Sequence, residues 1–305
     1  MKTIREIQDE IQRLKSEKNV AVAAHSYQSR EILEIADYTG DSFKLSVDLA
    51  GTKAETVVLC GVHFMAETAK LLCPEKRVIL AHPGCGCAMA AQISPEYVRE
   101  YKAAHPGCTA VCYINTTAAL KAECDVCVTS SSALKIVESL PEGEILFVPD
   151  RNLGGYVGGK NPDKAMTLYN GCCPVHDAVT ADEAREALAL HPDAKLLVHP
   201  ECRAEVAALA DYVGSTSGIM EYARASANEA FIIGTEVSIV DSLSYMLPEK
   251  RFYLLSPKLL CPDMRITSLM DVYRAVRGEG GEEILLDPAV EAGARRCIDR
   301  MIALG

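Results

Sequence analysis

The feature that most constrains this chain is a set of landmarks that occurs three times at nearly one period. Cys87, Cys173 and Cys261 lie 86 and 88 positions apart. Three other landmarks recur in the same order and with a similar spacing: a strand-like run ending in His25, Tyr113 or His199, a polar turn at Ser42, Ser130 or Ser215, and an apolar run ending at Gly61, Asp150 or Glu236. Repeats of fixed period indicate that one structural unit occurs several times. The sequence therefore predicts a triplicated unit.

Each predicted unit alternates strands and helices. Apolar residues at 4, 7, 11 and 14 form one face of an N-terminal helix, and Thr3 with Glu6 offers a capping box. Further helices are expected from about residue 94 and from about residue 180. Short apolar strands at this spacing, with glycine in the turns, favour parallel sheets covered by helices on both faces.

We therefore predict an α/β fold of three Rossmann-like α/β/α domains with small parallel sheets. The three are expected to be related by a pseudo-threefold axis, with the active site at their common interface. The predicted domains span residues 1–90, 91–176 and 177–305, and the last includes closing helices from about residue 265.

Composition limits the possible functions. The chain has 305 residues, 49% hydrophobic and 24% charged, which is ordinary for a soluble globular protein of two or three domains. The formal net charge of −11 argues against a nucleic-acid partner. No run approaches the ~18 apolar residues of a membrane span. The N-terminal residues contain no apolar signal core, so we expect a cytoplasmic protein.

The thirteen cysteines are an odd number, and a disulfide framework is not expected in a chain without an export signal. Cys60, Cys112 and Cys127 lie within apolar runs and are interpreted as buried structural residues. Cys124 and Cys127 form a C-x-x-C pair, but no second pair follows at zinc-finger spacing. The spacing therefore favours packing over a zinc or redox site there.

If the three units pack around a pseudo-threefold axis, Cys87, Cys173 and Cys261 converge on one metal centre. Iron–sulfur clusters are usually held by four cysteines. Three ligands leave one iron open to substrate, which distinguishes a catalytic metal from a structural one. The alternative is that duplication simply repeated three packing residues. Cys85 and Cys172 are close enough in the chain to compete as ligands.

The polar turns at Ser42, Ser130 and Ser215-Thr216 each precede a helical stretch. A single such turn is an ordinary helix cap, but three at one interface suggest a substrate with several carboxylates or a phosphate. No P-loop motif occurs, so nucleotide hydrolysis has little support. Groups suited to acid–base chemistry or hydrogen bonding follow the strand-like runs: His25, Tyr27, Tyr113, Asn115, His199 and Glu201.

Taken in order, these motifs resemble the quinolinate synthase family. The matching segments are His25-Ser-Tyr27-Gln, Gly40-Asp41-Ser42, Gly61-Val-His-Phe-Met-Ala-Glu67-Thr, Gly86-Cys87, Tyr113-Ile-Asn115-Thr, Pro149-Asp150-Arg-Asn152-Leu, Cys173-Pro-Val-His176, His199-Pro-Glu201-Cys202, Gly214-Ser215-Thr216 and Cys261-Pro-Asp-Met264. The resemblance implies a triangle of three α/β domains. It also implies one 4Fe–4S cluster per chain, held by Cys87, Cys173 and Cys261 with the fourth iron open. The family, an enzyme class of NAD biosynthesis, condenses iminoaspartate with dihydroxyacetone phosphate to give quinolinate, phosphate and water.

The resemblance also implies roles for individual residues. Substrate carboxylates or phosphate would be bound by His25, Ser42, Tyr113, Asn115, Ser130, His199, Glu201, Ser215 and Thr216. Tyr27 and Glu201, with His25 and His199, would carry the catalytic proton transfers. An aspartate oxidase or dehydrogenase would supply the unstable iminoaspartate.

The chain departs from the family pattern at three places. Ser26 replaces a tyrosine, and Ser132 stands where an asparagine is usual, so the role of position 132 is open. Cys297 has no partner at C-x-x-C spacing, so a thiol switch at the C-terminus is not predicted.

Two functions of other classes compete with this one. The three cysteines could belong to a non-enzymatic iron–sulfur carrier or sensor, which would not need the hydroxyl turns or the His/Glu set. Cysteine and histidine ligands could also serve a zinc-dependent lyase or aldolase acting on a phosphorylated substrate. Zinc without acid-labile sulfide would favour the latter.

Overall fold

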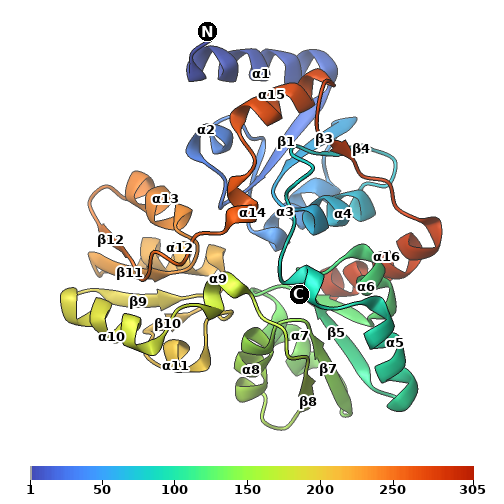
Figure 1. Ribbon diagram of the computed structural model, residues 1–305, viewed down its shortest axis with the longest axis vertical. Helices are drawn as coiled ribbons and strands as arrows, with labels where there is room; N and C mark the ends of the chain where they lie inside the picture. The colour runs from blue at the N-terminus through green and yellow to red at the C-terminus, as the bar shows by residue number, and fades with distance from the viewer. Residues whose placement is uncertain (1) are drawn as a thin grey trace.

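The computed structural model describes residues 2–305 and contains three separate sheets (Figure 1). The first has strands β1 (Val20–His25), β2 (Tyr38–Gly40), β3 (Thr56–Cys60) and β4 (Arg77–Leu80), to which a C-terminal strand β13 (Glu282–Glu283) is added. The second has β5 (Thr109–Tyr113), β6 (Val126–Val128), β7 (Glu144–Val148) and β8 (Ala165–Leu168). The third has β9 (Lys195–Val198), β10 (Tyr212–Val213), β11 (Ala230–Gly234) and β12 (Arg251–Leu254).

The strand order is the same in all three sheets. It reads β2-β1-β3-β4, β6-β5-β7-β8 and β10-β9-β11-β12, and every one of these neighbouring pairs is parallel. The triplication that the sequence predicts is therefore present in the topology. The α/β fold with three small, mostly parallel sheets is confirmed.

Helices alternate with the strands. Around the first sheet these are α1 (Ile4–Lys18), α2 (Arg30–Leu33), α3 (Ser42–Ala50) and α4 (His63–Leu72). The second unit has α5 (Pro95–Ala104), α6 (Ala118–Glu123), α7 (Ala133–Ser139) and α8 (Arg151–Lys160), preceded by the short η1 (Ala90–Gln92). The third has α9 (Pro174–Asp177), α10 (Ala181–Leu190), α11 (Ala204–Ala207), α12 (Thr216–Ala225) and α13 (Ser238–Met246).

Local sequence explains where the longer helices begin and end. The side chains of Thr3 and Thr180 each cap a helix by accepting the backbone N–H of a glutamate three residues later, and that glutamate carboxylate accepts the backbone N–H of the threonine. The helices that begin near residues 94 and 180 both end at a histidine C-cap, His105 and His191. The first strand of each unit is almost fully buried, because helices cover both faces of its sheet.

The C-terminal tail returns to the first two sheets. Helix α14 (Pro262–Arg265) leads into α15 (Leu269–Arg277), which lies beside α1 (Figure 1), and β13 pairs antiparallel with β4. The last helix, α16 (Pro288–Leu304), packs against α6 and β6 of the second unit. The sequence groups these closing helices with the third unit, but in space they cover the first and second. The exact domain boundaries stay a prediction.

Within residues 2–305, no helix has the length and apolar character needed to span a membrane. In Figure 1 the three sheets and their helices surround a common centre, which is where the candidate site lies.

Candidate active site

A cavity of about 300 Å³ lies where the three units meet. Its walls include nearly all of the residues that the sequence singles out: His25, Tyr27, Ser42, Cys87, Tyr113, Asn115, Ser130, Cys173, His199, Glu201, Thr216 and Cys261. Ser215 is the exception. It is buried one residue before Thr216, and its hydroxyl caps α12 by accepting a bond from the N–H of Gly218. The fold thus places the predicted site residues at the interface of the three units.

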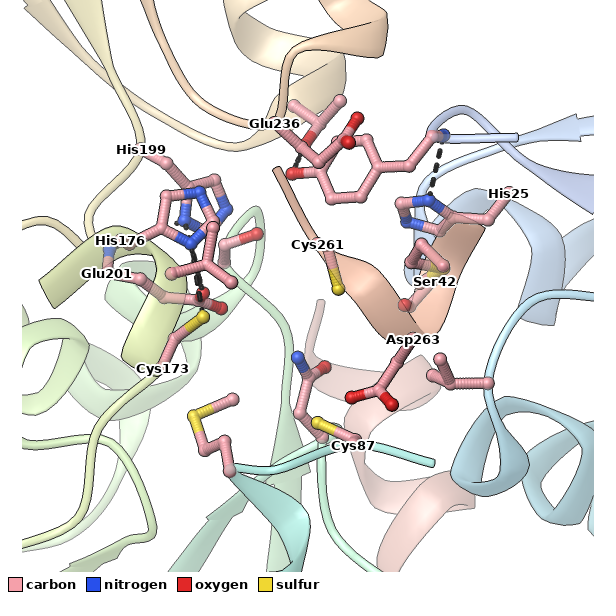
Figure 2. Close-up of a pocket in the computed structure, with 18 of the residues that line it drawn as sticks. His25, Ser42, Cys87, Cys173, His176, His199, Glu201, Glu236, Cys261 and Asp263 are labelled. Carbon is pink, nitrogen blue, oxygen red and sulfur yellow. Dashed lines mark hydrogen bonds and ion pairs between the residues drawn. The ribbon is translucent and has the colours of Figure 1, made fainter. Parts of the chain in front are cut away.

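Two of the three repeated cysteines share one local geometry, because Cys173 and Cys261 each form the N-cap of a short helix, α9 or α14, that begins with proline. The sulfur atoms of all three, including Cys87, face the same space in Figure 2. None is in a disulfide. Burial raises the pKa of Cys87 to about 12 and that of Cys261 to about 11, and it raises the pKa of Cys173 well above the ordinary range. These thiols are therefore neutral until a metal replaces their protons.

The two competing cysteines are placed differently. Cys85 is fully buried and hydrogen-bonds Thr267, whereas Cys172 is bonded through its backbone to Gln92. Neither residue lines the cavity.

His25 and His199 repeat a second local geometry. In each, Nδ1 accepts the backbone N–H of the residue two positions later, Tyr27 at 3.1 Å and Glu201 at 3.3 Å. Burial lowers the pKa of both histidines to about 4. Each ring is therefore neutral near pH 7 and carries its proton on Nε2, which makes it a hydrogen-bond donor.

Glu201 is the centre of a buried polar network. Its Oε1 accepts the Tyr113 hydroxyl at 2.6 Å, and its Oε2 lies 2.9 Å from Nδ1 of His176 and 4.0 Å from Nδ1 of His199. Burial alone would raise the pKa of Glu201, but the neighbouring histidines and the Tyr113 hydroxyl outweigh it and lower the pKa. The carboxylate is thus ionised near neutral pH.

A chain of hydroxyl groups leads from Tyr27 to His176. The Tyr27 hydroxyl is hydrogen-bonded to Thr216 at 2.7 Å and to Thr235 at 2.8 Å, and Thr235 is bonded to Nε2 of His176 at 3.1 Å. Burial raises the pKa of Tyr27 well above its ordinary value, so its hydroxyl keeps its proton at neutral pH. Residues from the first and third units are therefore linked through one hydrogen-bonded path.

Several residues of the site were given no role by the sequence analysis. His176 lies one helical turn after Cys173, with Nδ1 3.3 Å from its sulfur, and Cys173, His176 and Glu201 together could hold a metal ion. Glu236 and Asp263 also line the cavity (Figure 2), as does Lys258. Glu236 is fully buried and pairs with Arg265.

A usable signal for some of these residues was present in the repeat. Asp150 and Glu236 follow β7 and β11, the third strand of their units, and Thr235 is the residue just before Glu236. Asp150 accepts the backbone N–H of Cys173 at 2.9 Å, and burial together with the Glu201 charge raises its pKa to about 7. In the second unit, Asp150 after the third strand thus accepts the backbone N–H of Cys173. In the third unit, Thr235 after the third strand is bonded to the Tyr27 hydroxyl.

The departure at Ser132 has a structural explanation. Its hydroxyl accepts the backbone N–H of Thr129 at 3.0 Å and is bonded to the Thr129 hydroxyl at 3.1 Å. Ser132 therefore closes the turn that presents Ser130 to the cavity.

Comparison with known proteins decides which family this geometry belongs to. A family model described as "Quinolinate synthetase A protein" matches residues 9–303. The chain belongs to the quinolinate synthase family. It is similar to the quinolinate synthases of Geobacter metallireducens (46% identity over 298 residues, 98% of this chain and 97% of the relative) and Alkaliphilus metalliredigens (45% over 296 residues, 97% of each). It is also similar to the quinolinate synthase of Methanoregula boonei, with 46% identity over 298 residues and 98% of each chain covered.

Membership in the quinolinate synthase family confirms two predictions, namely the resemblance itself and the enzymatic function. Family membership also fits the predicted iron–sulfur cofactor, because quinolinate synthases, which act in NAD biosynthesis, use a 4Fe–4S cluster.

Proposed function

We propose that this protein condenses iminoaspartate with dihydroxyacetone phosphate to form quinolinate, phosphate and water. The observation that carries the proposal is the single cavity in which three free thiols meet a histidine–glutamate–tyrosine network. The full-length similarity to quinolinate synthases supports the same conclusion. A non-enzymatic carrier would not need this network.

The donor set fits a cluster with three protein ligands. Cys87, Cys173 and Cys261 would hold the 4Fe–4S cluster, because they are the three cysteines that line the cavity and none of them is in a disulfide. When bound, such a cluster supplies a Lewis-acidic iron that can assist loss of hydroxyl groups. Iron requires the thiolate form, so the three thiol protons would be released when the cluster binds.

Neutral hydrogen-bond donors are suited to the substrate anions. His25 and His199 carry a proton on Nε2, and Ser42, Ser130 and Asn115 add hydroxyl and amide donors on the cavity wall. Donors of this kind can bind carboxylates and a phosphate without leaving a buried cation unpaired when the substrate departs. Thr216 reaches the cavity, whereas Ser215 supports it by capping α12.

Proton transfer is assigned to Glu201 and Tyr27. Glu201 is ionised and lies within hydrogen-bond distance of two proton carriers, Tyr113 and His176. Tyr27 keeps its proton and can exchange it through Thr235 with His176. We propose Glu201 as a general base and Tyr27 as a donor, with His176 holding the carboxylate in place and His199 positioning the Glu201 backbone.

The substrate pair also implies a supplier. Iminoaspartate is an imine that water hydrolyses, so it must be produced close to the time of use. An aspartate oxidase or dehydrogenase carries out the required oxidation of the amine, and we propose a functional link to such an enzyme.

The first test is to measure iron, acid-labile sulfide and quinolinate formation on protein purified without air. About four irons and four sulfides per chain are expected, lost in each of Cys87→Ala, Cys173→Ala and Cys261→Ala. Cys60→Ala is the matched control, because Cys60 is buried at the end of β3 and does not line the cavity. Zinc without sulfide at this site would instead support the lyase, with Cys173, His176 and Glu201 as ligands.

A further inference from the structure

The first strand of each unit is followed by a short loop that carries residues of the active-site cavity. In the first and third units the loop begins at His25 or His199, whose Nδ1 accepts the backbone N–H of the residue two positions later. The carbonyl oxygen of each histidine also accepts the backbone N–H three positions later, from Gln28 at 2.9 Å or Cys202 at 3.0 Å. Each of these two loops is therefore fixed by its own histidine.

The second unit has Tyr113 at the corresponding position, so its loop lacks the ring nitrogen. We refer to residues 113–116 as the Asn115 loop, because Asn115 lines the cavity. Asn115 is the central residue of a tight turn in which the Thr116 N–H donates to the Ile114 carbonyl oxygen at 2.8 Å. The Thr116 hydroxyl donates to the Tyr113 carbonyl oxygen at 2.9 Å. These bonds shape the turn, but they connect only residues of the loop itself.

A buried lysine connects the Asn115 loop to the rest of the second unit. Lys121 is fully buried, and its amino group donates to the carbonyl oxygens of Ile114, at 2.8 Å, and of Thr116. These two carbonyl groups lie on either side of Asn115 in the chain. The amino group also lies 5.6 Å from the centre of the Phe64 ring, which belongs to the first unit and lines the cavity. Lys121 itself does not line the cavity, so it contacts the loop from behind the cavity wall.

The lysine occurs only in the unit that lacks the histidine. Lys121 is the fourth residue of α6, the helix that follows the first strand of the second unit. The fourth residues of the corresponding helices α2 and α11 are Leu33 and Ala207, whose side chains have no hydrogen-bond donor. Two units therefore have the histidine without the lysine, and one has the lysine without the histidine. This distribution is expected if both residues fix the loop after the first strand.

The burial of Lys121 supports the same interpretation. Lysine is almost never fully buried unless it is paired, because removing its amino group from water is costly. Within residues 2–305, its hydrogen-bond acceptors are the two carbonyl oxygens of the Asn115 loop and not a carboxylate. An apolar residue such as the leucine of the first unit would fill the space without this cost. The two bonds to the loop are therefore what the lysine provides.

We propose that Lys121 is a positioning residue for substrate binding, which holds the Asn115 amide at a fixed place on the cavity wall. This rests on the proposed function, in which Asn115 binds a carboxylate or the phosphate of the substrates. Tyr113 is fixed separately, because it is the last residue of β5 and is paired with Val128 of β6. Lys121 therefore acts through Asn115. Displacement of a substrate-binding group by about 1 Å can lower the rate by about 10²-fold.

The first test is steady-state kinetics of the cluster-loaded enzyme, purified without air. Lys121→Met removes the donors, and kcat/KM is expected to fall about 10–100-fold while iron and sulfide per chain stay at the wild-type level. In an Asn115→Ala background the same change should lower kcat/KM by less than about threefold, because the residue through which Lys121 acts is already gone. Lys15→Met is the matched control. Lys15 is also buried and donates to a backbone carbonyl group, that of Ile35 at 2.6 Å, but it does not line the cavity, so kcat/KM should not change.

Hydrogen exchange tests the contact without turnover. In Lys121→Met the backbone amides of the Asn115 loop should exchange about tenfold faster than in the wild type. The loops at residues 25–28 and 199–202 should keep their exchange rates, because their own histidines fix them. Lys121→Gln keeps amide donors and should show smaller changes in exchange and in kcat/KM, so it serves as the second variant if Lys121→Met folds poorly.

Three results would each overturn the proposal: wild-type kcat/KM in Lys121→Met, additive losses in the double variant, or exchange that rises equally in all three loops. Wild-type protein that holds a full cluster but forms no quinolinate would overturn the proposed function instead. The exchange measurement would then still decide whether Lys121 holds the Asn115 loop.

Discussion

Replacing Glu201 with glutamine is the sharpest test of the proposed active site. The glutamine side chain would keep the shape of the glutamate, and its carbonyl oxygen could still accept the Tyr113 hydroxyl that now lies at 2.6 Å. It could not accept a proton or balance a charge on His176, whose Nδ1 is 2.9 Å from the carboxylate. Glu201→Gln therefore removes the proton-accepting carboxylate and leaves most of the side-chain packing unchanged.

The size of the loss in rate distinguishes a general base from a residue that contributes only a hydrogen bond. Loss of a hydrogen bond to a charged group costs about 1.5–3 kcal/mol, which corresponds to a roughly 10–150-fold lower rate if the bond is needed in the transition state. Loss of a general base costs about 10²–10⁴-fold. Since we assign Glu201 as the base, we expect kcat to fall about 10²–10⁴-fold in Glu201→Gln, while iron and sulfide per chain stay at the wild-type level.

The chain contains a matched control. Glu144 on β7 accepts the Tyr101 hydroxyl at 2.5 Å and contacts Nδ1 of His105 at 2.9 Å, so it has the same kinds of partner as Glu201. It does not line the cavity. Glu144→Gln removes an equivalent tyrosine–glutamate–histidine arrangement and should leave quinolinate formation unchanged.

The assay is quinolinate formation without air, with iminoaspartate generated in the cuvette and saturating dihydroxyacetone phosphate. Each preparation is normalised to its iron content, so that cluster loss is not mistaken for lost chemistry. A Glu201→Gln enzyme with a full cluster and wild-type kcat would refute the assignment. Equal losses of kcat in Glu201→Gln and Glu144→Gln would instead indicate that both changes act by destabilising the protein.

Three further predictions follow from particular contacts. Tyr27→Phe deletes a buried hydroxyl with two partners, so we expect kcat/KM to fall about 10–100-fold at full iron content, and an unchanged rate would assign Tyr27 to packing. Although burial opposes it, hydrogen bonds led by that of Ser256 lower the pKa of Glu183 to about 2. Its contribution to stability is therefore present above its ordinary pKa of 4.5 and is lost as the pH falls toward 2, so the difference in Tm between wild type and Glu183→Gln should shrink over that range; a constant difference would contradict this. Gly293→Ala places a Cβ 2.9 Å from atoms of α6, and the overpacking cost of about 1–3 kcal/mol should exceed the helix-propensity gain of about 1 kcal/mol. Gly159→Ala, where the added carbon meets nothing within 4 Å, should be neutral or stabilising in the same urea titration, and a stabilising Gly293→Ala would show that α16 can shift.

The repeat explains how much could be predicted from sequence alone. Strand ends recur because each unit uses the same topology, so His25, Tyr113 and His199 could be aligned without knowing the fold. Parallel strands of one sheet end on one side, which brings such residues to the interface. The cavity lining was predictable for this reason.

Partners that cross between units were not predictable. Thr235 precedes Glu236, the residue at which the sequence analysis ends an apolar run, but its bonds to Tyr27 and His176 depend on how the first and third units are docked. The same limit applies to the tail, because an amphipathic helix such as α16 does not specify which sheet it covers. Cys297 illustrates the consequence, since its sulfur lies 3.6 Å from that of Cys112, which is 185 positions earlier in the chain.

The three copies are alike in one set of residues and different in another. A cysteine is kept at positions 87, 173 and 261, which would suit one iron–sulfur cluster bound by all three. At the strand ends, two units carry a histidine and the second carries Tyr113. The substrates have no threefold symmetry, so their carboxylates, phosphate and reacting carbons need different partners on each side. The three copies therefore agree at the cysteines, which face the proposed cluster. They differ at the strand ends, which face the asymmetric substrates.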